Sequence, residues 1–114
     1  MVRLLTFLFS RFVRINGTWE DDLIWCPSQC YYRFTYKGTS YIIYLRWRHD
    51  DPWTAELIEG DFVGEHWRYM DVGYHTESNW SGLKPAAIKE VKRLLFKRHF
   101  LGIPIYKNGK ETSA

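Results

Sequence analysis

Carboxylates and imidazoles, which are ligands for divalent metals, gather in three connecting regions of this chain. The chemistry they would support is that of a metal-dependent enzyme, with a site drawn from His49, Asp50, Asp51, His66 and His75. Their spacing matches no recognised ligand motif, although a site can be assembled without a local motif. We therefore expect a non-enzymatic protein without a cofactor and keep the metal enzyme as the third hypothesis.

The two cysteines, Cys26 and Cys30, are separated by three residues. A structural zinc site takes four ligands, usually as two short pairs, and the chain has no second cysteine pair. We interpret these residues as reduced thiols. A local disulfide would fit the spacing, but no other feature indicates an oxidising compartment, so we expect a cytoplasmic protein.

Cations are concentrated in one C-terminal segment. Residues 84–99 carry six Lys and Arg against one acid, whereas residues 1–83 carry eight cations against eleven acids. In a helix, Lys89, Arg93 and Lys97 form one exposed row, with Lys92 and Phe96 beside it. Cations around an aromatic ring suit phosphate contact and base stacking. The row predicts binding to nucleic acid or another acidic partner; a merely solvated helix face is the alternative.

A second cationic surface is predicted on a β-sheet. Arg33, Arg46 and Arg48 share one face of adjacent strands with Tyr31 and Tyr44. Sheets that display aromatic rings and arginines bind unstacked RNA bases in several folds. The alternative is that each arginine stacks on a tyrosine within the sheet itself.

The clearest structural element is a β-hairpin around Lys37-Gly38, because aromatic and aliphatic residues alternate with polar ones on both sides of it. A further strand at 53–59 would place Glu56 opposite Tyr44 and diagonal to Arg46. The face predicted to be core consists of Tyr32, Phe34, Tyr36, Tyr41, Ile43, Leu45, Trp47, Trp53, Ala55 and Leu57.

Turn signals delimit the remaining strands. Asn16-Gly17 predicts a turn, an edge strand is expected at 23–26, and another strand is expected at 66–72.

A helix is predicted over residues 84–99, since apolar residues recur there with helical spacing and Gly102 follows as a stop. Residues 1–14 are apolar with three arginines. They are too short to span a bilayer, which takes about 20 apolar residues, so we expect a buried strand or a short helix. An interfacial membrane anchor is the alternative.

These elements predict an α+β domain over residues 1–106, an antiparallel β-meander of four to five strands packed against the C-terminal helix, with 107–114 as a flexible tail. The leading functional hypothesis is a small binding module that regulates or inhibits a nucleic acid or nucleoprotein complex, of a kind that a phage or other mobile element would encode. The alternative is a protein-binding module that uses Trp and Tyr anchors or an edge strand, including as a homodimer. No membrane partner is expected.

Overall fold

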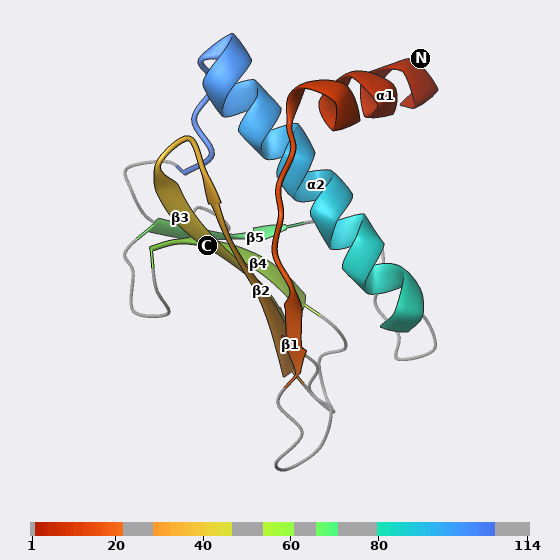
Figure 1. Ribbon diagram of the computed structural model, residues 1–114, viewed down its shortest axis with the longest axis vertical. Coiled ribbons are helices and arrows are strands. Elements are labelled where there is room, and N and C mark those ends of the chain that lie inside the picture. The colour runs from red at the N-terminus through yellow and green to blue at the C-terminus, as the bar shows by residue number, and fades with distance from the viewer. Residues whose placement is uncertain (1, 22–28, 47–53, 61–65, 71–79, 107–114) are drawn as a thin grey trace.

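The computed structural model describes residues 2–21, 29–46, 54–60, 66–70 and 80–106, and the predicted α+β fold is confirmed (Figure 1). Helix α1 (Val2–Phe12) lies against helix α2 (Trp80–Leu101), and α2 crosses one face of a single sheet. The sheet is an antiparallel meander whose strands are adjacent in chain order: β1 (Trp19–Asp21), β2 (Gln29–Tyr36), β3 (Thr39–Arg46), β4 (Thr54–Glu59) and β5 (His66–Met70).

The predicted hairpin joins β2 to β3 through a two-residue turn, with Tyr36 paired to Thr39. Lys37 and Gly38 both have positive φ, 49° and 83°, which is the conformation that a tight hairpin turn needs. The predicted register of the next strand is also confirmed, because Tyr44 pairs with Glu56 and Arg46 with Thr54.

The core lies between α2 and the inner face of the sheet. All the predicted strand residues that the structure describes lie in it, together with Cys30 and Met70, which were not predicted; Trp47 and Trp53 lie outside the described residues. From α2 come Leu83, Ala87, Val91, Leu94 and Leu95, all at most 4 % exposed. Burying one such side chain contributes about 1.5 to 3 kcal/mol, so this stripe fixes the rotation of α2 about its axis.

The outer face of the sheet is less solvated than its alternating pattern suggested. Ile42 and Ile58 point to this face, yet they are 1 % and 5 % exposed. They are cross-strand partners, and Ile58 in turn pairs with Trp67 of β5. The three side chains therefore form an apolar row across the middle of the outer face.

The turn predicted at Asn16-Gly17 is wrong, since residues 13–18 contain no turn and lead directly into β1. Gly17 is instead needed for a close approach to β2. A Cβ atom there would lie 2.4 Å from the carbonyl oxygen of Arg33 and 2.8 Å from the ring of Tyr32. The edge strand expected at 23–26 lies outside the described residues; β1 and β5 are the edge strands of the described sheet.

Helix α2 begins at Trp80, earlier than predicted, so Pro85 lies inside the helix. The helix ends where Gly102 adopts a φ of 71°, as predicted, and the amide of Ile103 then donates to the carbonyl of Lys97 at 2.9 Å. Ile105 and Tyr106 return to the core. The tail expected at 107–114 lies outside the described residues.

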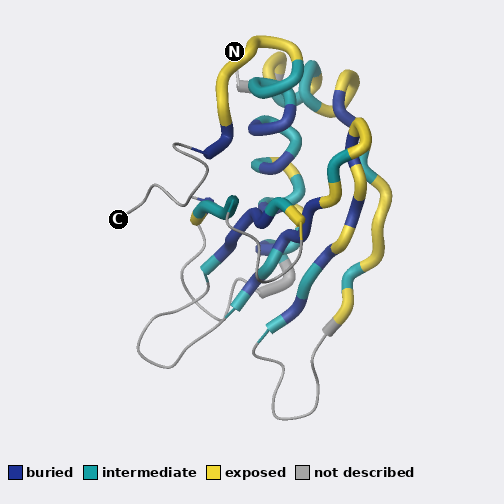
Figure 2. Tube along the Cα trace, turned by 90° about the vertical axis from the view of Figure 1, so that its left-hand side faces the viewer, coloured by how far each residue is buried: buried dark blue, intermediate teal, exposed yellow. Residues whose placement is uncertain are grey.

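The N-terminal segment is a short helix, one of the two forms expected, but it is not buried. Leu4, Leu5, Phe7 and Phe12 are all exposed, and Figure 2 shows many exposed residues at the end of the molecule that holds the N-terminus. Neither α1 nor α2 is long and apolar enough to cross a lipid bilayer, within the part of the chain that the structure describes.

Candidate functional site

The outward face of α2 carries the lysines predicted to bind a partner. Because the apolar stripe faces the sheet, Lys89 is exposed, while Lys92 and Lys97 are half-buried at the flanks of the helix. None of these three lysines has an ion pair within the described residues. Within those residues, no carboxylate neutralises their charges.

Arg93, predicted to belong to the same row, is already engaged. Its Nε donates to Oε1 of Glu90 at 2.8 Å, and a terminal nitrogen donates to the other oxygen of the same carboxylate. These hydrogen bonds raise the pKa of Arg93. Such a bidentate pair within one helix partly cancels the positive potential at this position.

Phe96 does not project into solvent as expected, because α1 packs on it. Its ring centroid lies 5.0 Å from that of Phe9, 6.1 Å from that of Phe12 and 5.2 Å from that of Phe100. These are ordinary packing distances for aromatic rings. Phe96 thus anchors α1 on α2 and is half-buried among these rings.

The arginines on the outer sheet face are paired across strands. Arg33 lies 3.4 Å from a carboxylate oxygen of Glu20, and Arg46 lies 3.4 Å from one of Glu56. Each guanidinium also lies near a tyrosine ring, 5.2 Å from Tyr31 for Arg33 and, for Arg46, 5.6 Å from Tyr44. The alternative in which arginine and tyrosine interact within the sheet therefore describes both positions. Arg48 lies outside the described residues.

Tyr44 also has a partner within the sheet, since its hydroxyl donates to Oε1 of Gln29 at 2.6 Å. The outer sheet face points away from α2, which covers the inner face (Figure 1). The two predicted cationic surfaces are therefore on opposite sides of the molecule, and they do not form one continuous platform.

Of the five residues proposed for a metal-dependent enzyme, only His66 is described; His49, Asp50, Asp51 and His75 lie outside the described residues. No group of three or more His, Cys, Asp or Glu that could hold a metal ion occurs among the residues that the structure describes. Cys30 is buried in the core, and Cys26 is outside the described residues. The enzyme hypothesis therefore stays a prediction.

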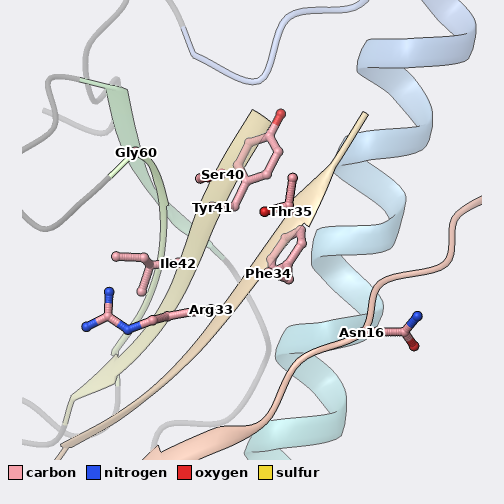
Figure 3. A pocket seen from close by; sticks show the side chains of 8 residues that line it. All are labelled: Asn16, Arg33, Phe34, Thr35, Ser40, Tyr41, Ile42 and Gly60. Carbon is pink, nitrogen blue, oxygen red and sulfur yellow. The ribbon is translucent and has the colours of Figure 1, made fainter. Parts of the chain in front are cut away.

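An open depression of about 590 Å³ lies beside the β2–β3 hairpin. Its lining residues contain no acid, histidine or cysteine. Figure 3 shows Arg33 and Asn16 pointing away from each other rather than toward a common point. Polar groups that converge are what a small-molecule site requires, so this depression adds no catalytic candidate.

Two features were missed from the sequence. Arg98 connects α2 to the sheet by donating to Glu59 at 2.6 Å and to the hydroxyl of Tyr41 at 3.1 Å, and burial raises the pKa of that tyrosine. The second is a group of exposed apolar side chains on α1 and at the end of α2. The helical spacing of apolar residues in 2–12 could have indicated the helix, but not which of its side chains stay exposed.

No family model matches this chain, and none of the curated proteins or solved structures with which it was compared matches it either.

Proposed function

We propose that this protein is a small non-enzymatic binding module that engages nucleic acid, or a nucleoprotein complex, through the outward face of α2. It would act as a regulator or inhibitor rather than as a catalyst. The contact site consists of Lys89, Lys92 and Lys97, with Arg93 as a partly neutralised neighbour. Arg33, Arg46 and Phe96 are left out of it because each is engaged within the molecule.

The sorting of charges supports this proposal. Each carboxylate whose side chain the structure describes is paired with an arginine: Glu20, Glu56, Glu59 and Glu90. Lys89, Lys92 and Lys97 of α2 have no such partner within the described residues. Unpaired cations on one face attract a polyanion, and neutralised arginines on the other face do not.

The test is the salt dependence of binding to generic duplex DNA and to single-stranded RNA. We expect the affinity to fall steeply as salt rises, because counterions are released from the phosphates that the lysines contact. Replacing Lys89, Lys92 and Lys97 by Gln should lower the slope of log affinity against log salt by up to about 3. If the protein binds neither nucleic acid at low salt, the proposal that it engages nucleic acid is wrong.

Lys89→Gln and Arg33→Gln form a matched pair, since each removes one cation from an exposed position. We expect Lys89→Gln to weaken binding and Arg33→Gln to leave it almost unchanged, because Arg33 is paired with Glu20. Equal losses in the two variants would indicate that net charge alone drives the association.

A protein-binding module is the second candidate, and one observation at the sheet edge favours it. On the edge strand β5, the rings of Trp67 and Tyr69 meet at right angles with centroids 5.2 Å apart, and Tyr69 is exposed. Amphipathic rings of this kind anchor protein interfaces. Sedimentation velocity over a range of concentrations would reveal a homodimer, and Tyr69→Ser should weaken it if β5 is the interface.

A further inference from the structure

Exposed apolar side chains are concentrated at one end of the molecule. Among the described residues, every exposed large apolar side chain except Tyr69 lies on α1, at the end of α2 or just after it. We call the following group the apolar surface: Leu4, Leu5, Phe7, Phe12, Phe100 and Leu101, which are 43 % to 58 % exposed. Exposed apolar groups on neighbouring elements mark a surface that a partner covers.

The way α1 is held explains why these side chains remain exposed. The rings of Phe9 and Phe12, in the second half of α1, contact Phe96 and Phe100 of α2. The first half of α1 extends beyond this contact, and Figure 1 shows its N-terminal end standing clear of α2. The apolar stripe of α1 is therefore longer than the part that α2 covers, and it projects from the fold as a ridge.

Among the described residues, the charged groups that lie over the rings of this ridge are cations. Residues 2–18 and 91–106 contain no Asp or Glu. The guanidinium of Arg11 lies 6.0 Å from the ring centroid of Phe7, and the ammonium of Lys37 lies 5.5 Å from that of Phe100. Arg14 is exposed just after α1. The apolar surface thus has positive charge beside it on both α1 and the β2–β3 turn.

We infer that the apolar surface docks on an anionic lipid bilayer, with α1 lying in the plane of the interface. A helix with leucines and phenylalanines on one face and arginines beside them binds in this way, through apolar burial and attraction to acidic headgroups. At 11 residues, α1 is too short to cross a bilayer, which takes about 20.

The observations favour a bilayer over other occupants. A second copy of this chain would bring Arg11, Arg14 and Lys37 close to their own equivalents, which like-charge repulsion disfavours. A projecting ridge also inserts more readily into a fluid interface than into a second convex surface. This inference is independent of the proposed nucleic-acid site, because it rests on α1 and not on Lys89 or Lys92.

The test is co-sedimentation of the whole protein with two kinds of vesicle, each at two salt concentrations. The neutral vesicles consist of phosphatidylcholine alone, and the anionic vesicles contain about 30 % phosphatidylserine in addition. We expect binding to the anionic vesicles that weakens as salt rises, and little binding to the neutral ones. The double variant Leu4→Ser with Phe7→Ser should bind the anionic vesicles at least about tenfold more weakly, because two apolar side chains no longer enter the interface.

Thr35→Ser is the control, since it changes an exposed residue of β2 that lies outside the apolar surface. It should bind vesicles like the unmodified protein. Leu101→Ser, at the end of α2, tests the same surface without changing α1 and should also weaken binding. Binding of DNA by all these variants should be unchanged, which separates failure of this inference from failure of the proposed function.

Two results would overturn the inference. One is that the unmodified protein fails to associate with anionic vesicles at low salt. The other is that Leu4→Ser with Phe7→Ser binds them as tightly as the Thr35→Ser control. If sedimentation shows a dimer that only the α1 variant dissociates, and vesicles are not bound, a second copy and not a bilayer covers the apolar surface.

Discussion

The outer face of the sheet and the outward face of α2 look alike in sequence, yet the structure treats their cations differently. On the sheet, Arg33 and Arg46 each meet a glutamate on a neighbouring strand. On α2, Lys89 and Lys92 meet no carboxylate within the described residues. A cation on a strand has neighbours fixed by the register, whereas a cation on the outward face of a helix has only its own helix beside it.

The difference teaches that the count of charges in a segment does not predict which of them are available. Residues 1–83 have a net negative count and residues 84–99 a positive one. In both segments, each carboxylate whose side chain the structure describes forms an ion pair with an arginine. The lysines that remain therefore define the candidate site.

The largest expected effect comes from weakening the packing of α2 on the sheet, which keeps the outer sheet face and the outward face of α2 on opposite sides of the molecule. Leu95 is fully buried between α2 and the sheet. Leu95→Ala should lower the free energy of unfolding by about 2 to 5 kcal/mol, because it removes buried methyl groups and leaves a cavity. Urea denaturation would measure this loss. Lys89→Ala, at an exposed position on the outward face of α2, is the control and should change stability by less than about 0.5 kcal/mol.

The next prediction tests whether the ion pair between Arg46 and Glu56 on the sheet stabilises the fold. Glu56 is buried and lies 3.4 Å from Arg46. Glu56→Ala should cost about 1 to 3 kcal/mol of stability, since the half-buried guanidinium loses its anion. A double-mutant cycle with Arg46→Ala would isolate the pair. A coupling energy of zero would mean that the interaction between Arg46 and Glu56 does not itself stabilise the fold.

A smaller effect is expected where the same kind of pair is solvated. The side chains of Arg33 and Glu20 are each 51 % exposed. Solvent screens such a pair, so Arg33→Ala should lower the free energy of unfolding by at most about 1 kcal/mol. Urea denaturation at low and high salt would check this. A loss as large as that of Glu56→Ala would contradict the role assigned to burial.

The last prediction concerns pH. His99 lies beside the ring of Tyr36, with centroids 5.1 Å apart. Burial, followed by the charges of Arg98 and Lys37, lowers the pKa of His99 below its usual 6.5. The unfolded chain therefore binds this proton more readily than the folded one, and stability falls as pH drops through about 6.5 toward the lower folded pKa.

The measurement is the free energy of unfolding of the protein and of His99→Phe between pH 7.5 and 5. The variant lacks the imidazole, so its stability should depend less on pH in this window. The imidazole is only partly buried, and we expect this effect to be the smallest of the four. A pH profile identical to that of the unmodified protein would assign the dependence to other groups.

Much of the fold could be predicted because it depends on patterns of short range. Alternation around Lys37-Gly38 determines which side chains of β2 and β3 face the core, since a slip of one residue would turn all of them outward. The helical spacing of Val91, Leu94 and Leu95 determines the face of α2 that meets the sheet. These choices need no knowledge of distant residues.

Less of the candidate site could be predicted, because whether a side chain can contact a partner depends on which residues pack against it in the folded protein. Gly17 indicated a turn but serves a close approach to β2. Phe96 has the spacing of a solvent-facing ring, and only the packing of α1 shows that it is covered. Carboxylates far away in sequence determine which arginines are neutralised, as Glu59 shows for Arg98.

The sequence by itself determined the meander, the hairpin turn and the inward face of α2, because each follows from local backbone preferences and the periodicity of apolar residues. Only the tertiary structure decided which cations stay unpaired and which apolar side chains stay exposed. Those properties depend on contacts between residues far apart in the chain, such as Arg98 with Glu59 and Phe9 with Phe96, and no local pattern encodes them.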